Sequence, residues 1–239
     1  MTGGEPAAGR CVLSVVIPAY NEEAFIGTLL NRITAVDLGS VGVAAEIIVV
    51  DDCSRDRTAA IAESFPSVKL ARLPVNGGKG RAVRTGIEMA AGDFLIIQDA
   101  DLEYDPADYL PMLRAILDGR GDVVYGSRYL RRGRYPGQSW AAYLGGRSLT
   151  LVALLMTRHY VSDTVTALKL FPRRLLAQLP LETSGFELDH EITARILARG
   201  CRIVEVPISY RPRSKAEGKK IGFRDWVVGA RTFWRYRRG

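Results

Sequence analysis

Three clusters of polar side chains stand directly after apolar segments of the 239-residue chain. They occupy residues 18–22 (PAYNE), 51–54 (DDCS) and 99–103 (DADLE). In open α/β sheets, ligands bind outside the carboxyl ends of the strands. The three clusters are therefore predicted to meet around one ligand site.

The third cluster carries the strongest signal for a metal ion. Asp99, Asp101 and Glu103 are spaced i, i+2 and i+4, and on extended backbone such side chains leave the same face. Carboxylate oxygens are hard ligands that suit Mg²⁺ or Mn²⁺ shared with a substrate diphosphate. A solvated turn is the alternative, but the apolar segment directly before these acids favours the metal.

The second cluster and the NGGKG segment at 76–80 suggest contacts with a nucleotide. One of Asp51 and Asp52 is expected to cap the following helix, and the other is free to accept hydrogen bonds from a base or ribose. Lys79 follows two glycines at a helix start, where it contacts the nucleotide or neutralises Asp51 or Asp52. The sequence does not decide between these two roles. P-loop, dinucleotide, GxSxG and HExxH motifs are absent.

Alternating strands and helices must position these clusters. Strands are expected at 12–17, 46–50, 68–73, 93–97 and 122–125, and helices at 22–36, 54–65, 76–91 and 108–117. Ser54 is the expected N-cap of the second helix. Continuous β-branched runs are typical of strands buried on both faces, so the alternation indicates a mostly parallel α/β sheet.

The pattern changes after Ser127. Residues 128–147 hold five arginines and no acid, which predicts a loop that is mobile or ordered by a ligand. Further helices are expected at 149–157, 187–199 and 223–234, and further strands at 167–171 and 202–210. The predicted organisation is a flexible tail (1–11), a catalytic domain (12–222) and a basic, aromatic C-terminal amphipathic helix (223–239).

Composition excludes several classes of protein. With 47% hydrophobic and 25% charged residues, the chain is neither disordered nor collagen-like. Three scattered cysteines form no metal or redox spacing and favour free thiols in a reducing cytosol. No apolar stretch is long enough to span a bilayer. The basic residues behind the net charge of +7 lie in one loop and one tail without a nucleic-acid motif, so nucleic acid is not an expected partner.

Seven segments, in their order and spacing, resemble the family 2 inverting glycosyltransferases. Within that family they are similar to the polyprenyl-phosphate sugar synthases, which include dolichol-phosphate mannose synthase and bacterial polyprenyl-phosphate glucosyltransferases. The segments are VVIPAYNEE (15–23), EIIVVDDCSRDRT (46–58), NGGKGRAVRTG (76–86), GDFLIIQDADLEYDP (92–106), VVYGSR (123–128), GFELDHEI (185–192) and EVPISYRPR (205–213). The resemblance covers 12–222 and implies a nucleotide-diphospho-sugar transferase (GT-A) fold, an α/β fold with a mostly parallel central sheet flanked by helices.

The resemblance also implies roles for individual residues. Pro18, Tyr20, Glu22 and Asp51 would line the nucleotide pocket, to which Lys79 is added as the nucleotide contact considered above. Asp99, Asp101 and Glu103 would hold Mg²⁺ or Mn²⁺. Arg128, Arg147 and Arg213 would face phosphates of donor or acceptor, with Arg128 and Arg213 catalytic. A metal and guanidinium groups would offset charge that builds on the departing nucleoside diphosphate.

The implied activity is inverting transfer of one hexose from a nucleotide sugar of the UDP-glucose or GDP-mannose type to polyprenyl or dolichyl phosphate. The acceptor phosphate is already ionised near neutral pH, so the reaction needs no general base. If the acceptor is instead a sugar or natural-product hydroxyl, Asp163 is the candidate base. A nucleotide-binding protein without turnover is a third hypothesis, against which the intact Asp99, Asp101, Arg128 and Arg213 argue.

Some features depart from the family. Members often carry C-terminal membrane helices that this sequence does not show, so a separate membrane-anchor subunit is a candidate partner. Segment 163–169 lacks the glycine or aromatic residue that family members commonly have before the lysine. This departure counts against carrying over the family's acceptor pocket to this segment. The QxxRW motif of processive synthases is absent, which favours single-sugar transfer.

The C-terminal segment predicts contact with a membrane. Trp226 and Trp234 with five arginines predict an interfacial helix on an anionic leaflet, hence a cytoplasmic enzyme peripheral to the membrane. The alternative is that these aromatic residues pack on the protein.

Overall fold

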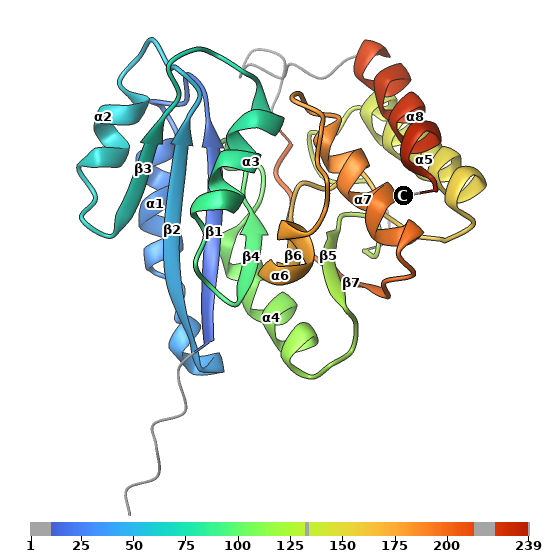
Figure 1. Ribbon diagram of the computed structural model, residues 1–239, viewed down its shortest axis with the longest axis horizontal. Helices are drawn as coiled ribbons and strands as arrows, with labels where there is room; N and C mark the ends of the chain where they lie inside the picture. The colour runs from blue at the N-terminus through green and yellow to red at the C-terminus, as the bar shows by residue number, and fades with distance from the viewer. Residues whose placement is uncertain (1–10, 132–133, 213–222, 239) are drawn as a thin grey trace, which may run out of the picture.

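The computed structural model describes residues 11–131, 134–212 and 223–238. These residues form a seven-stranded sheet with the order β3-β2-β1-β4-β6-β5-β7 (Figure 1). The strands are β1 (Cys11–Ala19), β2 (Val43–Asp51), β3 (Val68–Arg72), β4 (Phe94–Ile97), β5 (Val123–Ser127), β6 (Lys169–Pro172) and β7 (Ile203–Pro207). Strand β6 runs antiparallel to β4 and β5, whereas the other neighbours are parallel. The mostly parallel sheet that the sequence predicts is confirmed.

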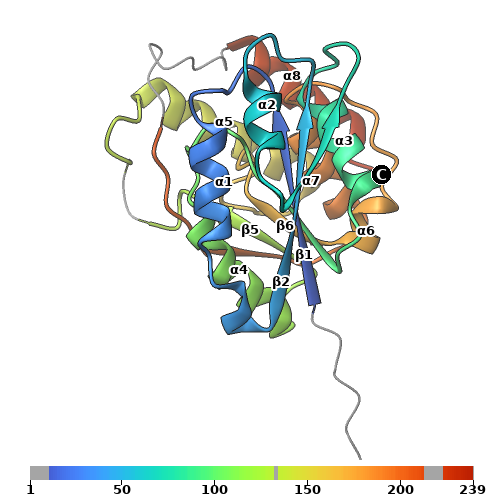
Figure 2. The ribbon, with the colours of Figure 1, turned by 90° about the vertical axis from the view of Figure 1, so that its left-hand side faces the viewer.

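Helices cover both faces of this sheet. The elements are α1 (Ile26–Thr34), η1 (Leu38–Val41), α2 (Thr58–Glu63), α3 (Lys79–Met89), η2 (Pro106–Asp108), α4 (Tyr109–Leu117), α5 (Trp140–Thr157), α6 (Arg173–Ala177), α7 (Leu188–Ala198) and α8 (Phe223–Tyr236). Figure 2 shows α1 and α4 on one side of the sheet, with α3 and α6 on the other. The chain is therefore a three-layer α/β structure.

Strand β1 explains why the buried runs lack polar alternation. Its residues Leu13, Val15 and Ile17 join the core on one face, while Val16 joins the core on the opposite face, and all four are fully buried. Burying both faces of a strand removes the need for alternating polar side chains. This packing fixes the strand ends that carry the polar clusters.

Helix α5 begins earlier than the sequence suggests. It starts at Trp140 rather than 149, and the Oγ of Ser139 caps it by accepting from the Ala142 amide at 3.2 Å. The low helix propensity of Gly145 and Gly146 hides this start. A Cβ at Gly146 would overlap the Tyr129 hydroxyl, so a larger residue there would displace the Tyr129 side chain. The expected loop over 128–147 is thus wrong for its last eight residues.

The expected caps of α2 are also wrong. Asp56, not Ser54, accepts from the backbone amide of Thr58 at 2.9 Å, and Ser54 Oγ accepts from the Asn21 amide instead. Asp51 accepts from the amide of Ser54, and Asp52 accepts from two amides before α3. The chain makes an extra turn before the helix, so neither Asp51 nor Asp52 caps α2.

Helix α8 packs against α5 and α7, beside the sheet (Figure 1). Phe233 and Tyr236 are buried in a small core there with Leu149 and Ala153 of α5, whereas Trp234 is 58% exposed. The packing of aromatic residues on the protein, the alternative left open by the sequence, thus holds for part of this helix. In the described residues, no helix is both long and apolar enough to cross a bilayer. The boundary at residue 222 lies outside the described residues and stays a prediction.

Candidate active site

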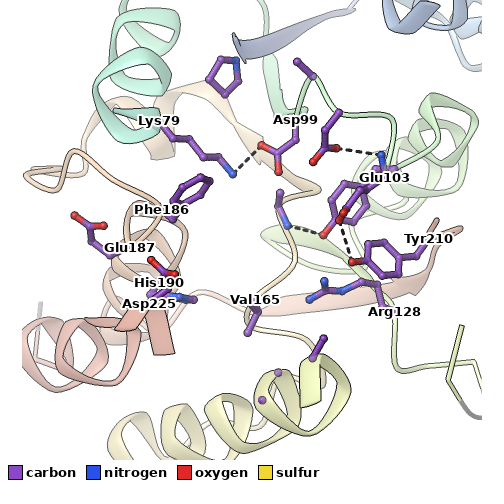
Figure 3. Close-up of a pocket in the computed structure, with 18 of the residues that line it drawn as sticks. Lys79, Asp99, Glu103, Arg128, Val165, Phe186, Glu187, His190, Tyr210 and Asp225 are labelled. Carbon is purple, nitrogen blue, oxygen red and sulfur yellow. Dashed lines mark hydrogen bonds and ion pairs between the residues drawn. The ribbon is translucent and has the colours of Figure 1, made fainter. Parts of the chain in front are cut away.

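The three polar clusters meet at one cavity of about 1100 Å³ (Figure 3). Its strand end, at the carboxyl ends of β1, β2 and β4, includes Pro18, Tyr20, Asp52, Asp99 and Asp101. Its helix end is formed by residues of α5, α7 and α8 together with Val165. The predicted convergence of the clusters is therefore what the structure shows.

Lys79 lies at the centre of a buried charge network at the strand end. Its Nζ is 2.8 Å from Asp99 Oδ1 and 2.9 Å from Asp189 Oδ2. Lys169, fully buried on β6, donates to the backbone oxygen of Asp189 at 2.8 Å. Burial disfavours the ammonium form, yet the pKa of Lys79 is raised because Asp189 and Asp99 attract the charge. Of the two roles that the sequence leaves open, the structure shows Lys79 neutralising carboxylates, but the partners are Asp99 and Asp189 rather than Asp51 or Asp52.

The NGGKG segment is held against the loop before α7. Gly78 has φ of +86°, and a Cβ there would lie 2.5 Å from the Ser184 carbonyl oxygen. The Gly80 amide donates to the same oxygen at 2.7 Å. Only glycine permits this backbone approach, which sets Lys79 on the cavity wall.

Asp99, Asp101 and Glu103 all line the cavity, but not as a strand would present them. Strand β4 ends at Ile97, and Leu102 has φ of +60°, so the backbone turns instead of alternating. Glu103 Oε2 accepts from the Tyr210 hydroxyl at 2.9 Å. In the described residues, no group of three acidic, histidine or cysteine side chains is arranged to hold a metal. The expectation that these three carboxylates leave one face of an extended strand is therefore wrong.

Two of these carboxylates nevertheless fit a divalent cation. Burial raises the pKa of Asp99, and the nearby Asp101 and Asp189 raise it further, against the opposing effect of Lys79. A crowded pair of carboxylates offers the hard oxygen ligands that Mg²⁺ or Mn²⁺ prefers, with further positions for substrate oxygens. Asp99 and Asp101 are therefore the residues whose chemistry fits a metal.

Arg128 follows β5 and is clamped by Asp163. Its Nε and Nη2 donate to the two Asp163 oxygens at 2.7 and 2.8 Å, and the Tyr210 ring lies 5.1 Å from its guanidinium carbon. Asp163 is fully buried and does not line the cavity, whereas Arg128 does. This geometry argues against Asp163 as a base and favours a positioning role.

Glu205 of β7 holds the clamp in place. Its carboxylate accepts from the Ser162 amide at 2.7 Å, the Ser162 hydroxyl at 2.7 Å and the Asp163 amide at 2.9 Å. A chain of contacts therefore runs from Glu205 through Asp163 to Arg128 on the cavity wall.

The other predicted residues are placed as follows. Pro18, Tyr20 and Glu22 line the cavity, whereas Asp51 and Arg147 do not. One oxygen of Asp51, which is 3% exposed, has no hydrogen-bond partner in the described parts of the chain. Arg147 lies over the Tyr129 ring at 5.2 Å. Arg213 is outside the described residues, so its role stays a prediction, as do the nucleotide roles.

The helix end differs in chemistry. Ala142, Gly145 and Leu149 of α5 face Val165, and Trp226 and Val228 of α8 complete the wall. His190 is 7% exposed, and its Nδ1 has no partner among the described residues. Burial lowers the pKa of His190 to about 4, with Lys169 adding to the effect. The histidine is therefore neutral near pH 7.

Charge across the whole cavity is strongly unbalanced. Among the described lining residues, seven are carboxylates and two are cations, Lys79 and Arg128, and both cations are already in ion pairs. Such a wall repels a diphosphate unless further positive charge is supplied.

Sequence reasoning missed Lys169, Asp189, His190 and Glu205, and it did not distinguish Asp52 from Asp51. Asp52 lines the cavity and accepts from the Gly77 and Gly78 amides at 2.7 and 2.8 Å. Lys169 and Glu205 each interrupt an apolar strand segment, ALKLF and IVEVP. A charged residue inside an apolar strand run indicates that the structure supplies it with buried polar or charged partners.

Solved structures share this architecture. Glucosyl-3-phosphoglycerate synthase from Mycobacterium tuberculosis, in complex with UDP, is 25% identical with a TM-score of 0.69 over 95% of this chain and 78% of that chain. Its complex with Mg²⁺ and UDP gives 25% identity and a TM-score of 0.67 over 88% and 74%. The fold is thus that of the GT-A glycosyltransferases.

Sequence relatives agree with this class. Residues 14–178 match the family described as Glycosyl transferase family 2. A dolichol-phosphate mannosyltransferase of Pyrococcus furiosus is 32% identical to this chain. The match covers 88% of this chain and 59% of the length of that protein. An uncharacterized glycosyltransferase of Mycobacterium bovis is 32% identical over 95% of this chain and 98% of its own length. The chain belongs to glycosyltransferase family 2 and is a glycosyltransferase.

Proposed function

We propose that this enzyme transfers a single hexose, with inversion, from a nucleotide sugar to polyprenyl phosphate at the cytoplasmic face of a membrane. The observation that carries the proposal is the two-ended cavity. Its strand end is acidic and polar, whereas its helix end combines a wall of small and apolar residues on α5 with Glu187, His190 and Asp225. An acceptor with a phosphate head and a hydrocarbon chain matches the apolar wall of the helix end. The dolichol-phosphate mannosyltransferase relative supports this acceptor class.

A divalent cation is part of the proposal. Asp99 and Asp101 would hold Mg²⁺ or Mn²⁺, consistent with the Mg²⁺ and UDP found in the mycobacterial enzyme. When bound, the cation supplies the positive charge that the carboxylate-rich wall lacks and offsets charge on the nucleoside diphosphate. Predicted contacts of Pro18, Tyr20 and Glu22 would orient the nucleoside part of the donor.

The residues of the chain would then favour a single displacement. Arg128, fixed by both Asp163 oxygens, presents its remaining guanidinium edge to the cavity, where it can stabilise phosphate charge that develops as the sugar leaves. An ionised acceptor phosphate attacks without a base. The apolar helix end limits the access of water, which would otherwise hydrolyse the donor.

A hydroxyl acceptor is the second candidate. Glu187 and Asp225 line the helix end together with neutral His190, and carboxylates or imidazole can accept a proton from an alcohol. Asp163 is not available for that purpose because Arg128 occupies both of its oxygens.

A donor and acceptor screen tests both candidates. UDP-glucose, UDP-galactose, UDP-N-acetylglucosamine and GDP-mannose are incubated with Mn²⁺ and either a short-chain prenyl phosphate in detergent or a panel of sugar alcohols. Mass spectrometry should detect a prenyl phosphate carrying one hexose and no longer polymer. Transfer to the alcohols alone would contradict the proposed acceptor, and donor binding without transfer to either set would favour a binding protein.

A further inference from the structure

The outer face of α5 carries an apolar stripe that the cavity does not use. Trp140, Leu144, Leu151 and Leu155 are 63%, 58%, 55% and 70% exposed. At 100° per residue, their spacing places all four within roughly 60° of the helix circumference and along about 22 Å of its length. Monomeric proteins rarely leave so many large apolar side chains exposed in one contiguous stripe.

Only positive charge surrounds this stripe in the sequence. Residues 128–162 contain six arginines and neither aspartate nor glutamate. Of these arginines, Arg131, Arg134 and Arg158 are exposed, and the Arg134 guanidinium lies 4.6 Å from the Trp140 ring. An apolar stripe flanked by arginine and interfacial tryptophan matches an anionic lipid surface.

The opposite face of the same helix lines the cavity. Ala142, Gly145 and Leu149 lie about 140° to 200° around the helix from Trp140 and belong to the cavity wall. One helix, about 10 Å across, thus separates the apolar stripe from the cavity. A phosphate presented at a bilayer surface would have only this helix to pass.

We infer that the outer stripe of α5 docks on an anionic bilayer, with α8 acting mainly as the brace that holds α5. This differs from the sequence prediction, in which the C-terminal helix itself enters the interface. Phe233 and Tyr236 of α8 are buried against α5 and α7, so they cannot contact lipid. The inference rests on the proposed function for the identity of the acceptor and deepens it by assigning the surface that meets the membrane.

A second copy of the chain is the competing occupant. Pairing two such faces would bring the exposed Arg131, Arg134 and Arg158 of each copy, six arginines in all, toward one interface without an acid from the 128–162 segments. Like charges at that density oppose association, whereas anionic headgroups neutralise them. Charge complementarity therefore favours lipid over self-association.

Vesicle co-sedimentation tests the inference with the full chain. The variant Leu144→Gln/Leu151→Gln/Leu155→Gln removes the stripe with helix-compatible residues outside the cavity wall. The matched control, Val75→Gln/Leu117→Gln, changes apolar residues that are 57% and 41% exposed on other elements. Circular dichroism and thermal melting establish that each variant is folded.

The wild-type chain and the control should sediment with phosphatidylglycerol-containing vesicles at low salt, and less at high salt. The triple variant should partition at least about tenfold more weakly. Equal sedimentation of the triple variant, or no sedimentation of the wild type, would overturn the inference. So would a wild-type dimer in light scattering that the triple variant abolishes, since the face would then join two copies.

Transfer to a short-chain prenyl phosphate in detergent separates this inference from the proposed function. The triple variant should retain wild-type turnover there, because its substitutions leave the cavity intact. Vesicle binding without transfer to any prenyl phosphate would support the surface and refute the acceptor. Transfer with unchanged vesicle binding in the triple variant would refute the surface alone.

Discussion

The two ends of the cavity are built in different ways. At the strand end, charged side chains come from residues directly after strands, and each charge is fixed by a partner, as Lys79 is by Asp99 and Asp189. At the helix end, the wall comes mainly from helices and is made mostly of small or apolar residues, with Glu187, Asp225 and a neutral, buried His190 beside them. The difference suggests that the sheet fixes the chemistry, while the helices select what the chemistry acts on.

Removing a carboxylate from the strand end of the cavity should have the largest effect on turnover. Asp101→Asn should lower turnover at least about a thousandfold, since a lost metal carboxylate leaves several kcal/mol of diphosphate charge uncompensated. The melting temperature should stay near that of the wild type. Steady-state kinetics with Mn²⁺ measure the effect, with the exposed Asp118→Asn as control. Wild-type turnover in the Asp101 variant would refute the metal assignment.

Arg128 lies between the two ends, so its loss should affect chemistry more than donor affinity. Arg128→Lys keeps the charge but removes the fork that grips both oxygens of Asp163. Turnover should fall about a hundredfold with a smaller change in the Michaelis constant for donor. Arg131→Lys, at an exposed site nearby, is the control. A raised donor Michaelis constant at unchanged turnover would mark Arg128 as a ground-state contact.

Replacing Glu205 tests whether a residue outside the cavity helps to position Arg128. Three donors point at its carboxylate, so Glu205→Gln turns an amide NH₂ toward at least one of them. Turnover should fall about tenfold, with unfolding free energy lowered by ~1–3 kcal/mol. Denaturant titration and kinetics measure both effects, and Glu63→Gln at the surface is the control. Lost stability with wild-type turnover would make Glu205 purely structural.

Filling the helix end of the cavity with a larger side chain should change the Michaelis constant for the acceptor and not that for the donor. A Cβ at Gly145 meets nothing within 4 Å, and the residue lines the cavity. Gly145→Leu should raise the acceptor Michaelis constant about tenfold without changing that of the donor. Gly145→Ala should stabilise the fold by ~0.5–1 kcal/mol through helix propensity. Equal effects of Gly145→Leu on donor and acceptor would show that the two ends are not separate.

His190 should have the smallest effect on turnover, and its effect on stability depends on pH. Burial lowers its pKa from 6.5 to about 4, so between these values the unfolded chain binds a proton that the folded chain does not. Its contribution to stability is therefore complete above pH 6.5 and is lost as pH falls toward 4, by up to about 3 kcal/mol. Chemical denaturation across this range should show a steeper rise of stability with pH in wild type and His159→Leu than in His190→Leu.

How much could be predicted from sequence also differs between the two ends. At the strand end, polar clusters at the ends of apolar runs located Asp99, Asp101, Pro18 and Tyr20, because strands and their ends are local features. Even there, the turn at Leu102 broke the expected spacing, since a positive φ at a leucine has no sequence signature.

The helix end was largely missed. Gly145 and Gly146 obscured the start of α5, and the packing of α8 on α5 joins residues far apart in the chain. Likewise, the pairing of Lys79 with Asp189 spans 110 positions, so no local pattern could reveal it.

The antiparallel strand β6 has a consequence for synthesis on the ribosome. Strands β1 to β4 find their parallel partners within residues 11–97, whereas β5 pairs only with β6 and β7. Until residue 172 has emerged, the β4 edge that β6 later covers and both edges of β5 therefore have no strand partner. Open edges recruit other chains, so this interval is when the growing polypeptide most needs chaperone protection.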